Sequence, residues 1–231
     1  METLQRVNSE GRERLYPSLT NPSWLVLRRR REIFRTWLSQ LESRELEVLD
    51  VGGRIQPYRP LLEGRLRRYV AVDIRPSPLV NLVARGEQIP LAGGQFDLVI
   101  CTQVLEYVPE PAAVIAEVYR LLKPGGSLLL SVPTAALQDA GEECWRFLPA
   151  ALAQLLAGFS QSEIVPEGGS IVGFFRTINS CLSVFVRYQA LRTIFQWTLC
   201  PLVNLSGELL ERLAHSDNCQ FTPNYSARAR K

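Results

Sequence analysis

Four short runs of aliphatic residues in the first 135 positions constrain the fold of this chain more than any other feature. They occupy residues 48–53, 69–74, 96–101 and 127–132, and polar residues hardly alternate with apolar ones within them. Such runs are typical of parallel strands that helices cover on both faces, because neither face of the strand then meets water. Helical or short crossover segments separate them, so the sequence predicts a doubly wound α/β architecture.

Weaker patterns complete this prediction. Three further strands are expected at 80–84, 162–165 and 221–230, which gives a mostly parallel sheet of seven strands. Helices are expected where apolar residues recur at helical spacing, namely over 24–41, 111–122 and 148–156. An apolar helical insert at about 170–214 precedes the last strand.

The domain boundary is expected near residue 45. Residues 1–20 read as a loose polar arm, and Asn21-Pro22 reads as the start of a helix. The arginines at 28–31 interrupt the apolar face of that helix; they indicate a solvated face, with a membrane- or phosphate-binding run as the alternative. Residues 46–231 are expected to form one domain that includes the insert.

Composition excludes several classes of protein. The 231 residues carry a net charge of only +3, so no nucleic-acid partner is expected. The five cysteines are widely spaced without a CxxC pair, which argues against a metal site or a disulfide framework. The first residues form no apolar signal, and the uncharged stretch from Thr193 to Gly207 is too short to span a bilayer, so a cytoplasmic location is the expectation.

Glycines and acids close the first two predicted strands. The first ends in Asp50-Val51-Gly52-Gly53, and the second ends at Asp73. In an open parallel sheet, ligands bind at the carboxyl ends of the strands, where glycine lets the backbone approach a ligand and an acid can accept hydrogen bonds from both ribose hydroxyls. The pattern indicates an adenosine-containing ligand, although glycines and acids are also ordinary turn residues after strands.

The stretch from about Leu46 to Pro133 resembles a known family. Strand-DVGG, strand-VDI, QFDLVICTQVLEYV and EVYRLLKPGGSLLLSVP follow one another as in the class I S-adenosylmethionine-dependent methyltransferases, specifically the small bacterial type 11 group. The resemblance extends to about residue 168, and it covers neither the first 45 residues nor the insert. It implies a Rossmann-like fold, S-adenosylmethionine as the cofactor, and methyl transfer as the reaction.

The resemblance also implies roles for individual residues. Asp50, Gly52 and Gly53 would form the loop under the methionine part of the cofactor, and Asp73 would hold the ribose hydroxyls. The remaining cofactor-binding candidates are Ile74 against adenine, Gly86, Glu87 and Gln88 at the adenine edge, and Gln103 near the methionine and the transferred methyl group.

The glycine loop departs from the family pattern. Arg54 and Gln56 stand where the second and third glycines usually are. Arg54 could pair with the carboxylate of the cofactor, which makes it a further binding candidate, or it could block the cofactor. The same loop lacks the Gly-x-Gly-x-x-Gly pattern that a dinucleotide needs, so a nicotinamide-dependent dehydrogenase is disfavoured.

Catalytic candidates are few. Positioning of the acceptor supplies much of the acceleration of methyl transfer, and a base is needed only where the acceptor keeps its proton at neutral pH. Tyr107, Glu106 and Glu143 lie near the predicted cofactor site; a pocket wall for Tyr107 and a cap or surface charge for Glu106 are the plainer interpretations. His215 is the only histidine, and it lies far from the motifs.

The apolar insert leaves the acceptor and the partners open. It could pack within the monomer, cover the site as a lid, form a homodimer, or make peripheral contact with a membrane. The expected activity is methyl transfer to a small-molecule acceptor or to a cell-surface or lipid-linked one. The alternative, favoured by the altered glycine loop, is a non-catalytic methyltransferase-like scaffold or partner of a biosynthetic complex.

Overall fold

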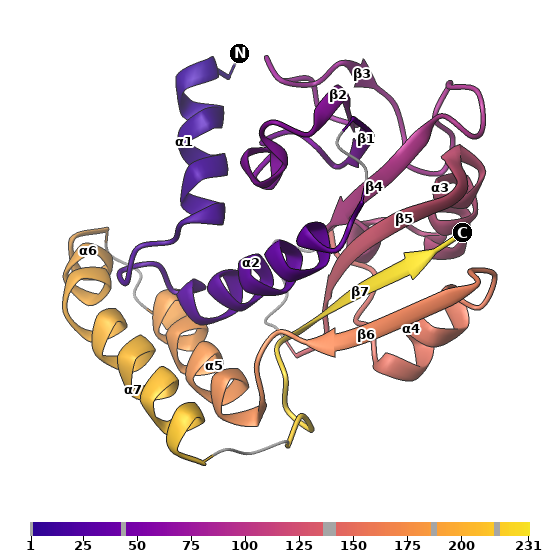
Figure 1. Cartoon of the computed structure of the whole chain (residues 1–231). Helices are drawn as coiled ribbons and strands as arrows, with labels where there is room; N and C mark the ends of the chain where they lie inside the picture. Colours follow the sequence, from indigo (N-terminus) through magenta and orange to yellow (C-terminus); the bar gives the residue numbers. More distant parts are fainter. Residues whose placement is uncertain (1, 43–44, 136–141, 186–188, 215–217) are drawn as a thin grey trace.

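The computed structural model describes residues 2–42, 45–135, 142–185, 189–214 and 218–231. Its centre is a seven-stranded sheet in the order β3-β2-β1-β4-β5-β7-β6, which confirms the predicted α/β architecture (Figure 1). The strands are β1 (Leu46–Val51), β2 (Leu66–Asp73), β3 (Leu82–Val83), β4 (Phe96–Thr102), β5 (Leu122–Pro133), β6 (Gln161–Pro166) and β7 (Asn224–Arg230). The first five run parallel, and β7 lies antiparallel between β5 and β6.

The aliphatic runs form the strands for the expected reason, because both faces of the sheet are covered. One face packs against α3 (Pro111–Leu121) and α4 (Pro149–Leu155), where Val114, Val118 and Leu152 are fully buried. The other face packs against α2 (Trp24–Ser39) and the short 3₁₀ helix η1 (Arg59–Leu62), where Phe34 and Tyr58 are buried against β1 and β4. Each face therefore buries its own hydrophobic core.

The N-terminal segment is a helix, which corrects the expectation of a loose arm. Helix α1 (Leu4–Leu15) begins at Thr3, whose hydroxyl accepts a hydrogen bond from the backbone N–H of Arg6 at 3.4 Å. A Cβ at Gly11 would lie 2.3 Å from the carbonyl oxygen of Ile55, so the helix backbone packs directly on the loop after β1. The sequence hid this helix because its buried stripe is narrow and consists of Val7, Gly11 and Leu15.

Several element boundaries differ from the sequence expectation. Helix α2 begins at Trp24, two residues after Pro22, because the side chain of Asn21 accepts from the backbone N–H of Ser23 and closes a turn first. Strand β3 is shorter than the predicted 80–84, and β7 begins at Asn224 and not at 221.

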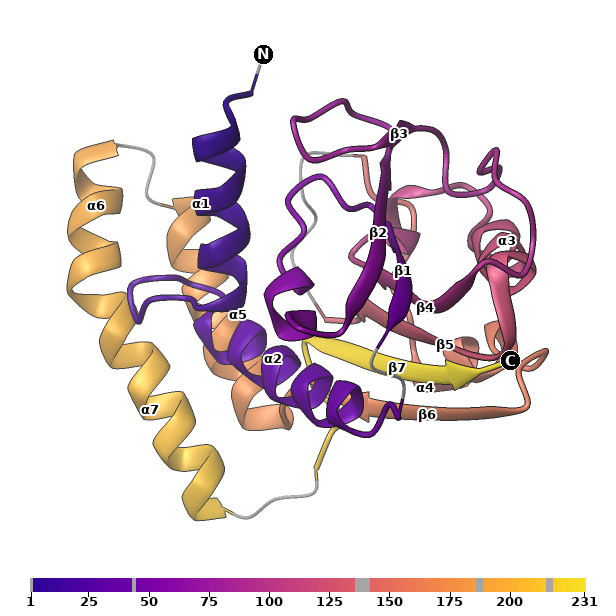
Figure 2. The same cartoon turned by 45° about the horizontal axis from the view of Figure 1, so that its top comes forward.

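The insert consists of α5 (Ser170–Phe185), α6 (Gln189–Trp197) and α7 (Leu199–Ala214), as the pattern predicts. These helices stand beside α1 and α2 along one side of the molecule, away from the distal edge strand β3 (Figure 2). The side chains of Asn179 and Asn204 hydrogen-bond at 2.9 Å between α5 and α7, and Asn204 also donates to the carbonyls of Leu19 and Asn21. The insert is therefore tied to the α1–α2 connection.

Candidate functional site

The glycines after β1 form a tight turn. Gly52 has a φ of +78°, which favours glycine, and a Cβ there would lie 2.3 Å from the Cγ2 of Val104. The backbone N–H groups of Gly52 and Gly53 donate to the carbonyl of Val72 at 2.8 and 3.1 Å. The turn thus ties the ends of β1, β2 and β4 together at the carboxyl edge of the sheet.

Asp50 is a buried residue of β1 that lies just before this turn. Its carboxylate is 2% exposed and accepts a hydrogen bond from the Tyr69 hydroxyl at 2.6 Å. Burial raises the pKa of Asp50 to about 7, the Tyr69 hydrogen bond opposes this, and the charge of Asp73 adds to it. Since Asp50 lies inside the fold, its part in a site is to hold the turn.

Arg54 and Gln56 have partners within the protein. The guanidinium of Arg54 contacts the carboxylates of Glu2 and Glu10 in the N-terminal segment at 2.8 Å. Gln56 has a φ of +44°, and its side chain donates to the carbonyl of Leu79 at 2.6 Å. These contacts hold both side chains away from the glycine turn. The two residues that depart from the family pattern therefore do not cover the turn.

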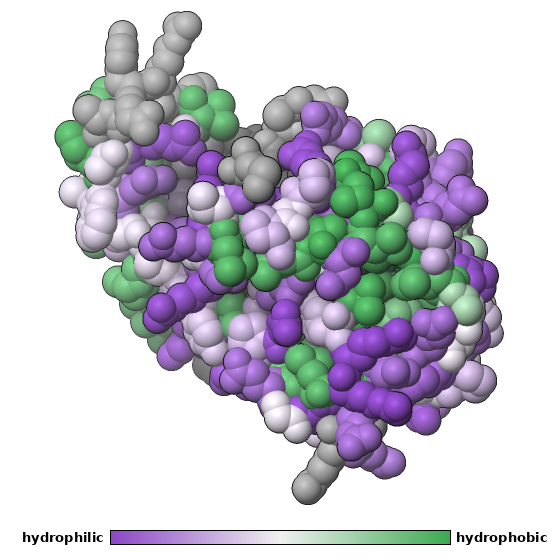
Figure 3. Space-filling model, turned by 90° about the horizontal axis from the view of Figure 1, so that it is seen from above, coloured by the Kyte–Doolittle hydropathy of each residue, from purple (hydrophilic) through white to green (hydrophobic). Residues whose placement is uncertain are grey.

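The acid at the end of β2 is half-buried, with one oxygen available. The Oδ1 of Asp73 accepts from the backbone N–H of Arg75 at 2.8 Å, whereas Oδ2 accepts no hydrogen bond from the part of the chain that the structure describes. Ile74 beside it is 64% exposed. Seen from above, this end of the molecule presents hydrophobic surface framed by hydrophilic residues (Figure 3).

The segment 86–88 is divided in its exposure. Gly86 is buried, and a Cβ added there would make ordinary van der Waals contact with Val51 and Val114. Glu87 pairs with Arg85 at 2.9 Å, and Gln88 is exposed. These residues flank the end of β1 on the side of α3.

Strand β4 ends in a strained residue. Gln103 has a φ of +55°, which is uncommon for a residue with a Cβ. Its backbone N–H donates to the carbonyl of Ser131 at 2.8 Å, and its side-chain amide lies 3.3 Å from that of Asn224. This conformation turns the amide of Gln103 across the ends of β5 and β7, and such strain is often found at functional sites.

Glu106 is buried, which corrects its interpretation as a surface charge. It is 1% exposed, and within the described residues its Oε2 has no hydrogen-bond partner. Burial raises the pKa of Glu106 to about 7. The backbone N–H groups of Cys144 and Trp145 donate to the backbone carbonyl of Glu106, so a later segment packs against this residue.

The other two catalytic candidates lie beside Glu106. Tyr107 is 39% exposed, as expected of a pocket wall, and Glu143 pairs with Arg146 at 2.6 Å. His215 lies outside the described residues.

A cavity of about 620 Å³ brings part of this site together. Gln103, Glu106, Tyr107 and Glu143 line it from the strand ends, and Arg54 and Ile55 line it from the loop after β1. The remaining wall comes from α1, α2, α5 and α6. The cavity thus lies where the carboxyl ends of the central parallel strands meet the helices that the resemblance does not cover.

Sequence reasoning missed the arginines of this cavity. Arg30, expected on a solvated face, is 2% exposed, and its Nε donates to both carboxylate oxygens of Glu167 at 2.8 and 3.0 Å. Burial alone would lower the pKa of Arg30, but the charge of Glu167 outweighs it and raises that pKa. The missed signal is that Arg30 follows Leu27 and precedes Phe34 at helical spacing, on the buried stripe.

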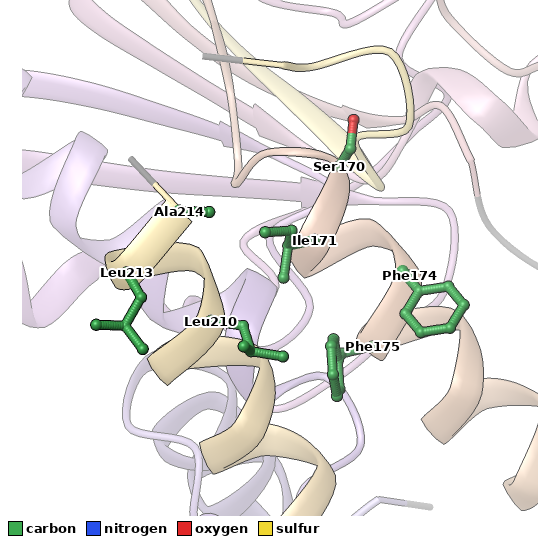
Figure 4. A pocket seen from close by; sticks show the side chains of 7 residues that line it. All are labelled: Ser170, Ile171, Phe174, Phe175, Leu210, Leu213 and Ala214. Atoms are coloured by element: carbon green, nitrogen blue, oxygen red, sulfur yellow. The ribbon is translucent and has the colours of Figure 1, made fainter. Parts of the chain in front are cut away.

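A second pocket, of about 500 Å³, lies between α5 and α7. Its wall is almost wholly apolar and contains Phe174, Phe175, Leu210 and Leu213 (Figure 4). It has no titratable side chain, so it carries no catalytic candidate. Among the helices that the structure describes, none combines the length and apolar character that crossing a membrane requires.

Comparison with known proteins agrees with this geometry. Residues 49–130 match the model of a family described as "Methyltransferase domain". Ubiquinone biosynthesis O-methyltransferase of Pseudomonas paraeruginosa is 44% identical over 75 residues, which cover 31% of this chain and 30% of that protein. The matched segment thus spans less than a third of that relative.

Solved structures resemble nearly the whole chain at low identity. A SAM-dependent methyltransferase from Thermotoga maritima superposes with a TM-score of 0.54 at 14% identity, covering 96% of this chain and 99% of the other. The 1,6-didemethyltoxoflavin-N1-methyltransferase of Burkholderia thailandensis, solved with S-adenosylhomocysteine, has a TM-score of 0.53 at 18% identity, covering 97% and 83%. Residues 49–130 are thus similar to the methyltransferase-domain family, and the chain as a whole has the Rossmann-like fold of the solved methyltransferases.

Proposed function

We propose that this chain is an S-adenosylmethionine-dependent methyltransferase that acts on a small-molecule acceptor. The family match over residues 49–130 supports the reaction, and the relative named an O-methyltransferase supports an oxygen acceptor. The observation that carries the proposal is the cavity at the strand ends, which Glu106 lines. The buried Oε2 of Glu106 has no hydrogen-bond partner among the described residues.

The described residues fit the cofactor. The available Oδ2 of Asp73 is suited to the ribose hydroxyls, and the exposed Ile74 is suited to an adenine ring. Gly52 and Gly53 allow a tight turn at the end of β1, where the side chains of Val104 and Ala71 pack closely, and the contacts of Arg54 with Glu2 and Glu10 hold its guanidinium in place. When bound, S-adenosylmethionine supplies an electrophilic methyl group.

Glu106 is the proposed general base. A carboxyl group with a pKa of about 7 is divided between its two forms at neutral pH, so it can accept the proton of an acceptor hydroxyl. Tyr107 and the segment that begins at Glu143 would exclude water from this point. Gln103 would position the acceptor.

Calorimetric titration with S-adenosylhomocysteine tests the cofactor site. Wild type should bind, and Asp73→Ala should weaken binding by at least about tenfold, since a charged hydrogen bond is lost. Asp97→Ala is the matched control, because Asp97 lies at the opposite end of the sheet and pairs with Lys123. No binding by wild type at millimolar ligand would leave the non-catalytic scaffold as the better proposal.

A methyl-transfer assay on hydroxylated aromatic acceptors tests the base. Glu106→Gln should lower the rate by about 10²–10⁴-fold while S-adenosylhomocysteine still binds. A variant as active as wild type would show that Glu106 is not the base.

We also propose that the exposed apolar face of α6 and α7 docks on an anionic bilayer surface. Both helices form an outer layer away from the sheet (Figure 1, Figure 2). Their exposed large hydrophobic residues are Leu191, Ile194, Trp197, Leu199, Leu202, Leu205, Leu209, Leu210 and Leu213. A face of this extent, with Trp197 72% exposed, is typical of an interfacial contact.

Charge favours a bilayer over a second copy of the chain. Arg192 and Arg212 are the exposed charged residues of α6 and α7 in the described structure, and three guanidinium groups, from Arg28, Arg29 and Arg212, share the carboxylate of Glu208. Two such faces would repel each other, whereas anionic headgroups would attract them. Docking there would bring the enzyme to cell-surface or lipid-linked acceptors.

Co-sedimentation with phosphatidylglycerol-containing vesicles tests this proposal. Leu202→Glu/Leu209→Glu should abolish binding, whereas Leu148→Glu, which changes a leucine of similar exposure at the start of α4, should not. Equal binding of wild type and the double variant, or a dimer in sedimentation velocity that the double variant dissociates, would overturn it.

A further inference from the structure

Three arginines line the cavity without an acidic partner among the described residues. They are Arg14 of α1, Arg176 of α5 and Arg192 of α6, and no carboxylate of the described chain forms an ion pair with any of them. The cations Arg30 and Arg54 in the same wall are each neutralised, by Glu167 and by Glu2 with Glu10.

Most carboxylates of the wall pair with other residues. Glu143 pairs with Arg146, and Glu13 accepts from the side chain of Asn21 at 3.0 Å. Glu10 pairs with Arg54 and with Arg6. Glu106 has a pKa of about 7, and its charge raises the pKa of Arg14 without forming an ion pair with it.

Arg14 is exposed and Arg176 is half-buried, so an anion in the cavity can reach both guanidinium groups. Desolvation lowers the pKa of Arg14, as does the charge of Arg30, whereas the charges of Tyr58, Tyr107 and Glu106 raise it. Desolvation also lowers the pKa of Arg176, again with a contribution from Arg30. Arginines that line one cavity repel one another, and an anion bound between them would offset this repulsion.

We infer that this cavity binds the carboxylate or phosphate group of an acidic acceptor through Arg14 and Arg176; the inference rests on the proposed function. A guanidinium donates two parallel hydrogen bonds to either group, which gives strong and oriented binding. The volume of about 620 Å³ suits a small molecule. The unpartnered Oε2 of Glu106 in the same wall then marks the end at which a hydroxyl of this acceptor reacts.

Titration with three aromatic probes tests the inference. Benzoate, phenyl phosphate and neutral benzyl alcohol are titrated calorimetrically into the full chain without cofactor. At least one of the two anions should bind at least ten times more tightly than benzyl alcohol. The anion with the higher affinity shows whether the acceptor carries a carboxylate or a phosphate group. Equal affinity for all three probes would overturn the inference.

Variants locate the binding. Arg14→Gln and Arg176→Gln should each weaken the preferred anion by at least tenfold and leave benzyl alcohol unchanged, whereas Arg12→Gln, on the same helix as Arg14, should have no effect. Arg176→Lys should restore part of the affinity, and thermal denaturation checks that each variant is folded. Wild-type affinity in both Gln variants would overturn the inference.

The two proposals fail separately. Anion binding is measured here without cofactor or turnover, and the cofactor site is tested by S-adenosylhomocysteine alone. A chain that binds S-adenosylhomocysteine but no anion keeps its proposed function and loses the acidic acceptor. A chain that binds the anion but not S-adenosylhomocysteine loses the proposed function, and the cavity is then an anion site of a non-catalytic protein.

Discussion

The sheet region of residues 46–133 and the helical layer of α1, α2, α5, α6 and α7 solve the same packing problem by different means. The sheet region is held by buried aliphatic side chains on both faces. The helical layer depends on buried ion pairs and amides, such as Arg30 with Glu167 and Asn179 with Asn204, and leaves a wide apolar face exposed. The family match falls within the first region, and the arginines of the cavity come from the second.

This difference indicates a division of labour at the cavity. The strand ends offer Gln103 in the cavity wall, with the glycine turn and Asp73 outside it, and these residues suit the proposed cofactor. The helices offer Arg14 and Arg176, which suit the acidic acceptor that we propose. Polar contacts are directional and thus select a ligand, whereas apolar packing chiefly sets the shape of the scaffold.

The largest effect is expected where the helical layer joins the sheet. Glu167→Gln removes the carboxylate that Arg30, Ser131 and Ser226 all contact, and leaves the Arg30 charge buried without its partner. The free energy of unfolding should fall by roughly 3–5 kcal/mol, as measured by urea denaturation. Arg30→Met/Glu167→Leu should cost less, and a Glu167→Gln loss under 1 kcal/mol would show that this pair does not join the two regions.

A pH-dependent effect of up to about 4 kcal/mol is expected within the sheet region. The pKa of Asp50 is raised from its ordinary value of 3.8 to about 7, so the folded state binds its proton more tightly than the unfolded state does. Its contribution to stability is thus full below pH 4 and is lost as the pH rises to 7. Between pH 4 and pH 7, the free energy of unfolding of Asp50→Asn, measured by urea denaturation, should rise relative to that of wild type. A difference between the two proteins that does not change with pH would contradict the raised pKa of Asp50.

A smaller effect is expected at the glycine turn. Gly52→Ala places a Cβ 2.3 Å from Val104 at a φ of +78°, and we expect a loss of roughly 2–3 kcal/mol with weaker S-adenosylhomocysteine binding. Gly64→Ala is the matched control, because its φ is +77° and no atom lies within 4 Å of the added Cβ. The difference between the losses of unfolding free energy in these two variants measures the effect of the close contact with Val104. Equal losses would show that only the strain of the positive φ matters.

The smallest effect is expected at the outer rim of the helical layer. Glu10→Gln removes one of the two carboxylates that hold Arg54, which are partly exposed, so unfolding should change by about 0.2–1 kcal/mol. If Arg54 then turns toward the cofactor site, S-adenosylhomocysteine binding will change more than stability does. Equal small changes in both would assign Arg54 a purely structural contact.

The local sequence predicted secondary structure well where hydrophobic burial dominates. The aliphatic runs predicted the central strands, and the apolar pattern predicted a helical insert, because a continuous buried surface leaves a local pattern. Helix α1 escaped because three buried residues leave almost no pattern. Glu106 escaped because its burial depends on the segment at Cys144 and Trp145, which closes over it from nearly 40 positions away.

What the sequence by itself determined is the parallel sheet, most of the strands and helices that follow one another along the chain, and the acid and glycines at the carboxyl edge. Only the tertiary structure decided the character of the cavity. It buried Arg30 against Glu167, 137 positions away, tied Arg54 to the N-terminal helix, and left Arg14 and Arg176 without ion-pair partners among the described residues. The physical reason is that hydrophobic burial leaves a pattern in neighbouring residues of the sequence. The balance of charges in a cavity, in contrast, depends on contacts between residues that are far apart in the sequence.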